Sequence, residues 1–285
     1  MYGKTKYRFA ILAILCGAIV GMSCYTPSYL GPPVLRLKGS DTMLPMARLW
    51  AEEYMLANRG MSIYVEGGGT ATGAAALANG TADICMASRP LRPQEAQRLA
   101  ENYNTVGISI LVAKDALSVY VHPENPVQVL SLSDLKGIYQ GEITNWSQLG
   151  GNDLAIDVVN RSPNSGTFLY FQQHVLGGEN YTASSRTLPT TRQVVQAVAE
   201  NPSAIGYGGI AYESDVAHCK INSVEPSTQS VADDTYPLTR YLYLYTVDTP
   251  RGRSKNFINW VISKEGQDIV KRSGYFPIWQ RDRQD

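Results

Sequence analysis

The chain alternates short apolar runs with longer segments of helical periodicity from residue 34 onward. In the first helical segment, four apolar side chains recur on one face at spacings of three and four, at Ala47, Trp50, Ala51 and Tyr54. Strands separated by helices of this length predict βαβ units around a parallel sheet, and therefore the α/β class. The expected strands are residues 34–37, 62–66, 82–87, 155–160, 204–207 and 241–247. The expected helices are residues 42–58, 71–79, 92–102, 132–139, 166–175, 191–201 and 255–272. Residues 223–235, which are rich in Ser and Asp, are expected to form a loop.

The centre of the chain predicts a passage between two lobes. Residues 108–121 consist of two strand-like apolar stretches around the charged pair at positions 114–115, which is where the chain can leave one lobe and enter another. We therefore expect residues 34–114 and 239–285 to form the first lobe and residues 115–238 to form the second. Two strands would then cross between the lobes and act as a hinge.

The first 23 residues predict a secretory signal peptide, because three cations precede an apolar run, residues 9–22, that is too short to span a bilayer comfortably. Cys24 then stands where a bacterial lipoprotein signal places its acylated cysteine, so we expect lipidation of Cys24. Residues 24–33 would tether the exported domain to a membrane, in the periplasm or at the cell surface. The motif is imperfect, because Gly21 replaces the usual large aliphatic residue, and the alternative is that Cys24 is incidental and cleavage falls elsewhere.

Charge and motif content exclude several classes of protein. The chain has 25 Lys and Arg residues against 25 Asp and Glu residues, so no overall field attracts nucleic acid. Its three histidines are widely separated and no metal or haem motif occurs, so we expect neither a metal nor a cofactor. Beyond the leader and Cys24, only Cys85 and Cys219 remain. Export allows a disulfide between them, but we favour a buried structural thiol and an unrelated second one.

Three segments combine hydroxyl groups with glycines where a strand leads into a helix. They are residues 39–42 (GSDT), 67–73 (GGGTATG) and 161–167 (RSPNSGT). Helix N-termini carry unpaired backbone N–H groups and a partial positive charge, so a tetrahedral anion bound there gains hydrogen bonds. In an open α/β sheet such loops lie at the carboxyl ends of the strands, where ligands bind. Together the segments predict an oxyanion site.

Each loop alone has a plainer interpretation, because a Ser or Thr before a helix is usually an N-cap. The combination of three such loops with Arg161 favours anion binding instead. The glycine-rich segment is not a nucleotide-binding loop, since Ala74 and Ala75 stand where a Walker A motif requires Lys and Ser or Thr. It does not satisfy the GxGxxG pattern either.

The order and spacing of these motifs resemble the periplasmic phosphate-binding proteins of ABC transporters, which are type II solute-binding proteins. The resemblance covers nearly the whole chain from residue 34 and rests on LKGSDTMLPMARLWAEEY, EGGGTATGAAALANGTADICMASRPL, LSLSDLKGIYQGEITNWSQLGG, RSPNSGTFLYF and AIGYGGIAY. It implies two α/β lobes joined by a two-strand hinge, with the ligand in the cleft between them. We expect a monomer.

The resemblance also implies ligands from both lobes. Those expected from the second lobe are Arg161, Ser165, Gly166 and Thr167, which match the family's principal phosphate ligands. In the first lobe, Ser40 or Thr42, together with Thr70, match the family's hydroxyl-bearing loops. We also expect Asp41, Ser88 and Arg89 at the site.

Two positions depart from the family's pattern. Members that select phosphate over sulfate commonly use an Asp after the third strand to accept a phosphate proton, and Arg89 stands there. Pro163 replaces an acidic residue that some members carry between the arginine and the serine. Both changes remove negative charge, so we expect weaker discrimination between phosphate and sulfate. Asp41 is the nearest remaining proton acceptor, unless it only caps the helix.

These observations predict a solute-binding lipoprotein that delivers inorganic phosphate, or a similar oxyanion, to an ABC transporter permease. One alternative is a binding module that senses an oxyanion without transporting it. The other is a hydrolase with Ser165 or Ser40 as nucleophile, but the chain has no GxSxG motif and no His close to either serine in sequence. We therefore expect a binding protein and not an enzyme.

Overall fold

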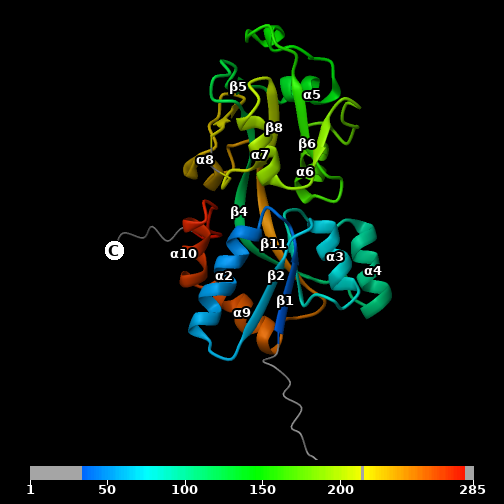
Figure 1. Ribbon diagram of the computed structural model, residues 1–285. Coiled ribbons are helices and arrows are strands. Elements are labelled where there is room, and N and C mark those ends of the chain that lie inside the picture. The colour runs from blue at the N-terminus through cyan, green and yellow to red at the C-terminus, as the bar shows by residue number, and fades with distance from the viewer. Residues whose placement is uncertain (1–33, 213–214, 280–285) are drawn as a thin grey trace, which may run out of the picture. The chain divides into compact units, whose positions relative to one another are not determined.

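The computed structural model describes residues 34–212 and 215–279. The expectations for the signal peptide, Cys24 and the tether lie outside these ranges. Helices and strands alternate along the described chain, which confirms the α/β class (Figure 1). In chain order the elements are β1 (Val34–Gly39), α2 (Leu44–Ala57), β2 (Ser62–Glu66), α3 (Thr70–Ala78), β3 (Ile84–Ala87), α4 (Pro93–Tyr103), β4 (Ile108–Val121), β5 (Val129–Leu130), α5 (Leu132–Gln140), the 3-10 helix η1 (Trp146–Leu149), β6 (Asp157–Arg161), α6 (Gly166–His174), β7 (Arg186–Leu188), α7 (Thr191–Ala199), β8 (Ala204–Gly209), β9 (Ala217–His218), β10 (Lys220–Ile221), α8 (Thr228–Ala232), β11 (Thr239–Thr246), α9 (Gly252–Val261) and α10 (Lys264–Arg272). None of the helices in the described ranges is long and apolar enough to cross a membrane.

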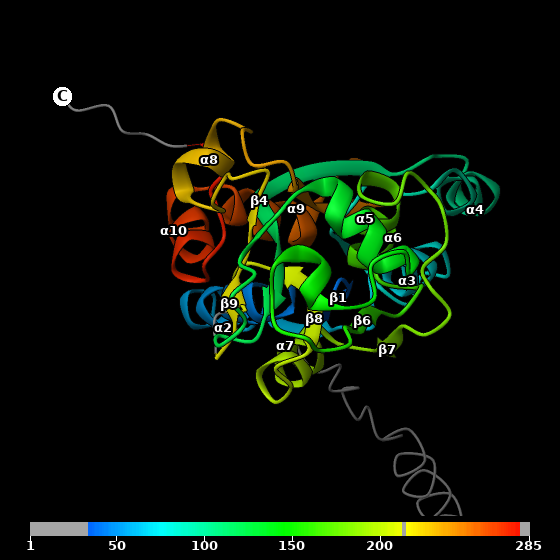
Figure 2. The same ribbon diagram turned by 90° about the horizontal axis from the view of Figure 1, so that it is seen from above.

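The first lobe is a sheet with helices on both faces (Figures 1 and 2). Its strands lie in the order β2-β1-β3-β11-β4, with β1 parallel to β2 and β3, and β11 antiparallel to β3 and β4. Side chains of β3 alternate between the faces. Met86 packs with α2, α9 and α10 around Trp50, whereas Cys85 packs with α3 and α4 around Leu77 and Leu99.

The second lobe continues the sheet through β4, β8, β6 and β7. Strand β6 is parallel to β7 and β8, and β8 is antiparallel to β4. Helices α5 and α6 contribute Tyr139 and Phe171 to an aromatic core, in which Phe171 stacks on Tyr207 of β8 at 4.1 Å between ring centroids. A smaller cluster packs α7 against β6 and β8 through Val194 and Val198.

A single strand, β4, serves both lobes. Its residues 108–116 pair with β11 and its residues 117–121 pair with β8. The sequence suggested two stretches here, but no Gly or Pro interrupts the run, so the strand stays continuous. The change of partner between Ala116 and Leu117 supports the predicted lobe boundaries at 114/115 and 238/239, which stay predictions.

Two expected elements differ from the structure. Residues 255–272 form parts of two helices, because Ser263 adopts an extended conformation with φ −74° and ψ 174° between α9 and α10. The expected loop at residues 223–235 contains the short helix α8, which is capped by Ser227 through a hydrogen bond from the Ser230 amide. The α8 difference follows from this Ser227 N-cap, whereas Ser263 separates α9 from α10 through its extended backbone and makes no capping hydrogen bond with its side chain. Cys85 and Cys219 are free and buried, as favoured above.

Candidate oxyanion-binding site

The three hydroxyl-bearing loops meet between the two lobes. Thr42, in the turn between β1 and α2, and Thr167 of α6 have their Oγ1 atoms 3.0 Å apart. The Ala71 amide donates to the Asn164 carbonyl at 3.3 Å, and Asn164 Nδ2 donates to the Gly68 carbonyl at 3.0 Å. The structure therefore brings residues of both lobes into one buried cluster.

Thr70, Ser88 and Gly166 form the closest part of this cluster. The Ser88 amide donates to Thr70 Oγ1 at 3.2 Å, and the two hydroxyl oxygens lie 3.5 Å apart. A Cβ atom at Gly166 would lie 2.4 Å from Ser88 Oγ and 2.5 Å from Thr70 Oγ1. Only glycine can begin α6 at this distance from the first lobe.

The N-cap interpretation fits one of the three loops. Ser165 caps α6, because its Oγ accepts a hydrogen bond from the Thr167 amide at 3.1 Å. In the described chain, neither α2 nor α3 has a side-chain cap at its first residue. The buried hydroxyls of Ser40, Thr42 and Thr70 therefore do not cap these helices. Those of Thr42 and Thr70 lie beside Thr167 and Gly166 of the second lobe.

Arg161 ends β6 inside the cluster and is buried. Its Nη1 donates to Thr191 Oγ1 at 2.5 Å, and its Nη2 donates to Asp41 Oδ2 at 3.1 Å and to the Pro189 carbonyl at 3.0 Å. Burial lowers the pKa of Arg161, and the Asp41 carboxylate opposes this effect. Its Nε has no hydrogen-bond partner among the described residues. Arg161 is therefore a buried cation with an unused N–H donor.

Asp41 links the glycine-rich loop to the second lobe. Its Oδ1 accepts a hydrogen bond from the Gly68 amide at 2.9 Å, while its Oδ2 accepts from Arg161. The Tyr212 hydroxyl donates to the Asp41 backbone carbonyl at 2.8 Å. The side chain does not cap α2, and 14% of it is exposed. Asp41 therefore provides a carboxylate at the edge of the cluster.

Arg240 of β11 and Asp115 of β4 form a second buried ion pair, which the sequence motifs did not identify. Arg240 donates to Asp115 Oδ2 from Nε at 2.9 Å and from Nη2 at 2.7 Å. It also donates from Nη1 to Thr167 Oγ1 at 2.8 Å and from Nη2 to Thr42 Oγ1 at 3.2 Å. The available signal was an Asp within the apolar residues 108–121, since a charge in a buried strand requires a partner.

The Arg89 guanidinium pairs with Glu95 of the same lobe, which disfavours its expected role as a phosphate ligand. Its guanidinium donates to both carboxylate oxygens of Glu95, in the first turn of α4, at 2.7 Å each. Both side chains are 7% exposed. A bidentate pair in a buried environment is strong enough to fix the orientation of Arg89. The loop after β3 therefore contributes Ser88 to the cluster and not the Arg89 charge.

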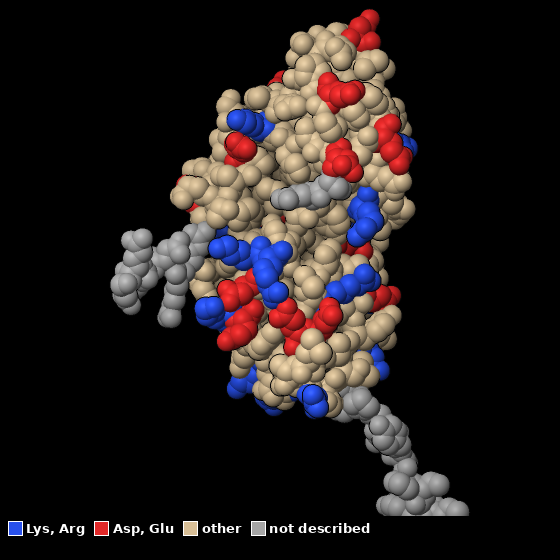
Figure 3. All heavy atoms as spheres, turned by 60° about the vertical axis from the view of Figure 1, so that its left-hand side comes forward, with Lys and Arg blue, Asp and Glu red and all other residues tan. Residues whose placement is uncertain are grey.

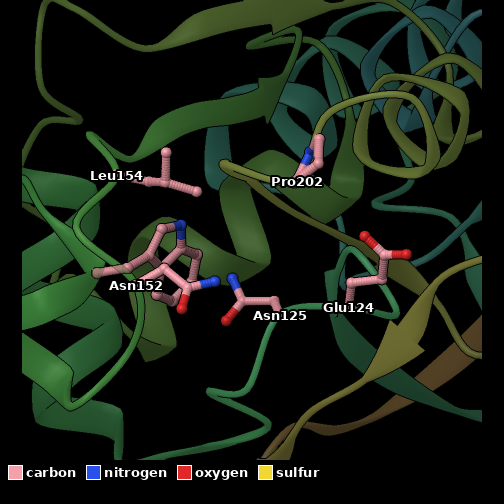
Figure 4. Close-up of a pocket in the computed structure, with 6 residues that line it drawn as sticks. Glu124, Asn125, Asn152, Leu154 and Pro202 are labelled. Carbon is pink, nitrogen blue, oxygen red and sulfur yellow. The ribbon is translucent and has the colours of Figure 1, made fainter.

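A separate surface pocket lies in the second lobe. It is lined by Glu124, Asn125, Trp146, Asn152, Leu154 and Pro202 (Figure 4). None of the expected site residues lines it, and the Glu124 carboxylate disfavours an anion there. Within the described residues, no group of three or more His, Cys, Asp and Glu side chains could hold a metal ion.

Exposed charges of both signs are mixed over α2 and α10 (Figure 3). Arg272 pairs with Glu53 at 2.6 Å, and Lys264 pairs with Asp268 at 2.8 Å. Neighbouring charges of opposite sign cancel at a distance, so this face does not generate the field that attracts nucleic acid.

This chain is similar to a known protein family and to several named proteins. The model of the PBP superfamily domain matches residues 26–265. The chain is 31% identical over 263 residues to the phosphate-binding protein PstS of Pseudomonas aeruginosa PAO1, covering 84% of this chain and 81% of that protein. It is 32% identical over 251 residues to PstS of Bacillus subtilis 168, covering 86% and 80%.

Two solved structures are also similar to this chain. The putative phosphate ABC transporter substrate-binding protein of Clostridium perfringens, determined with bound phosphate, is 31% identical and superposes with a TM-score of 0.81, covering 87% of this chain and all of that one. A phosphate transport receptor of Vibrio cholerae is 28% identical with a TM-score of 0.71, covering 85% of this chain and 99% of the other.

The Arg89–Glu95 pair predicts a pH-dependent contribution to stability. Burial would raise the pKa of Glu95, but hydrogen bonds from the Arg89 side chain and the Arg92 amide outweigh it and lower the pKa below 4.5. The pair therefore stabilises the fold above pH 4.5, and this contribution is lost as the pH falls through the lowered pKa. We expect Glu95→Gln to reduce the free energy of unfolding by about 3–5 kcal/mol at neutral pH.

Urea unfolding of wild type and Glu95→Gln at neutral and strongly acidic pH measures this difference. The deficit of the variant should shrink in acid, where the wild-type carboxyl is protonated too. Glu265→Gln, at an exposed position, serves as the control and should change stability little at either pH. A deficit of equal size at both pH values would contradict the assigned role of the ion pair.

Proposed function

We propose a function for this chain, which belongs to the PBP superfamily and to its periplasmic phosphate-binding proteins. The protein captures inorganic phosphate outside the cytoplasm and delivers it to an ABC transporter. The observation that carries this proposal is the convergence of hydroxyl groups and a buried guanidinium between two lobes. The relatives named for phosphate binding cover most of the chain, so the proposal concerns the whole exported domain. We propose that it acts as a monomer.

Phosphate would be held by donors from both lobes. The first lobe offers the Thr42 and Thr70 hydroxyls, together with Ser88, and the second offers Thr167 and Arg161. The N-terminus of α6, which begins at Gly166, adds backbone N–H groups and a favourable dipole. Hydrogen bonds to a charged group contribute about 1.5–3 kcal/mol each, so several of them offset the cost of removing an anion from water.

Contacts between the lobes favour a closed form. Asp41 pairs with Arg161, Tyr212 bonds to the Asp41 carbonyl, and Asn164 bonds to Gly68. These contacts are hydrogen bonds and one ion pair, and within the described residues the chain passes between the lobes on β4 and at the start of β11. Opening about these strands would break the bonds and expose the cluster, which gives the anion a way in and out.

Binding alone accounts for the residues of the cluster better than hydrolysis does. Ser165, one of the two serines considered as a nucleophile, has its Oγ engaged by the Thr167 amide. The family is one of substrate-binding proteins. An oxyanion sensor without a transport role would use the same site. A permease gene next to the gene for this protein would favour transport over sensing.

We predict that Arg161 is the dominant ligand. Arg161→Lys keeps the charge but loses the planar fork of donors, so phosphate binding should weaken by about 1.5–3 kcal/mol, and Arg161→Ala should cost more. Thr70→Ala should cost about one hydrogen bond. Calorimetric titration with phosphate measures these losses, with Arg186→Ala, a half-exposed arginine of β7, as the control. Undiminished binding by Arg161→Ala in a folded protein would refute the assignment.

Selectivity should depend on Asp41. The loop after β3 supplies no carboxylate, so Asp41 is the group proposed to accept a proton from phosphate. A carboxylate repels sulfate, which carries no proton, and the neutral amide of Asp41→Asn can donate to it. We therefore expect Asp41→Asn to improve sulfate binding relative to phosphate, as measured by paired titrations. Strict phosphate selectivity that survives the change would show that another acceptor is used.

We also propose that a lipid on Cys24 anchors the protein to the membrane. The support is the leader sequence, with its cations, short apolar run and cysteine. Cys24→Ala should move the protein from the membrane fraction to the soluble fraction. A wild-type protein that is already soluble, with a mature N-terminus other than Cys24, would contradict the proposal.

A further inference from the structure

The Arg240–Asp115 ion pair lies where the chain passes between the lobes, on β4 and at the start of β11. The two residues are register partners of β11 and β4, next to the point where β4 exchanges β11 for β8. Both are almost completely buried. The Arg240 guanidinium also lies over the Tyr170 ring, 5.9 Å from its centroid. Asp115 and Tyr170 together fix the position and plane of this guanidinium.

Arg240 reaches one hydroxyl from each lobe. Its Nη2 donates to Thr42 Oγ1 of the first lobe at 3.2 Å, and its Nη1 donates to Thr167 Oγ1 of the second at 2.8 Å. These two oxygens are 3.0 Å apart. One guanidinium group therefore sets the positions of both hydroxyls.

The chemistry of the guanidinium decides the direction of these bonds. A guanidinium has five N–H donors and no acceptor, so both threonine oxygens must accept from it. Each hydroxyl hydrogen is then directed elsewhere. One O–H can donate to the other oxygen, but the second O–H needs a different acceptor. An oxyanion beside the two threonines can accept from both.

We propose that Arg240, oriented by Asp115, is a positioning residue that directs the Thr42 and Thr167 hydroxyls as donors toward bound phosphate. This inference rests on the proposed function and specifies how one end of the site recognises its ligand. Because the hydroxyls donate there, that end favours phosphate oxygens that carry no proton. Arg240 acts through the two threonines and need not touch the anion.

A double-mutant cycle on phosphate affinity tests this inference. Thr167→Val removes the hydroxyl at nearly constant volume and should weaken phosphate binding about tenfold or more in the wild-type background. The second background combines Arg240→Met with Asp115→Asn, so that no buried charge is left unpaired. There the hydroxyl is no longer oriented, and Thr167→Val should weaken binding less than about threefold. Thr42→Val should show the same pattern with a smaller coupling, because its bond to Arg240 is longer.

The control background combines Arg186→Met with Asp157→Asn, which removes another Arg–Asp pair of the second lobe. Thr167→Val should keep its full cost there. If the Arg240→Met background does not fold, as judged by circular dichroism, Arg240→Lys replaces it. A single ammonium cannot serve Asp115 and both hydroxyls with the same geometry, so the cost of Thr167→Val should shrink in that background too.

The outcomes separate this inference from the function on which it rests. Wild-type protein that fails to bind phosphate in the calorimeter overturns both. Wild-type binding with equal fold losses for Thr167→Val in all backgrounds overturns only the positioning role, since additive losses show that Arg240 contributes to structure alone. Reduced losses confined to the Arg240 backgrounds support the role.

Discussion

Two guanidinium groups are buried between the lobes, and the rest of the interface is arranged around the need to neutralise them. Removing one partner of a buried ion pair typically costs about 3–5 kcal/mol, so each arginine requires an acceptor nearby. Asp115 meets this need for Arg240 within the hinge strands, and Asp41 meets it for Arg161 across the lobe interface. The first pair joins register partners of β4 and β11, whereas the second joins the turn after β1 to the end of β6. If the lobes open as proposed, the second pair breaks.

The same constraint explains why the hydroxyl groups gather here. Guanidinium N–H groups that do not bond to a carboxylate need other hydrogen-bond acceptors when they are buried. The Thr167 hydroxyl is such an acceptor for Arg240. Arg161 still has an Nε donor without a partner among the described residues. Such a donor in a buried position represents unsatisfied hydrogen-bonding capacity, which an anion would satisfy. The close approach of Gly166 to Ser88 keeps the two sides of the cluster near enough to share one small ligand.

Arg89 shows that a buried ion pair can hold a charged side chain that the sequence places near a predicted site. From its position in the chain, Arg89 would add a positive charge after β3, yet Glu95 neutralises it and directs it toward α4. The acidic function proposed for the cluster then falls to Asp41, which reaches it from the turn after β1. Selectivity between phosphate and sulfate is consequently assigned to a different loop from the one that the family pattern indicates.

Features that depend on neighbouring residues could be predicted from local patterns in the sequence. Its periodicity predicted the α/β class and most helices and strands, and the combination of hydroxyls, glycines and Arg161 indicated an oxyanion site, because helix N-termini and strand ends are encoded by neighbouring residues. Which charged side chains pair with each other depends on the three-dimensional fold. Asp115 and Arg240 are 125 positions apart, and their contact follows from the register of β4 against β11. Arg89 has its partner only six positions away, but the choice between that partner and the cluster depends on where α4 packs. The partner of a buried guanidinium depends on distances and burial in three dimensions, and a local sequence pattern contains neither.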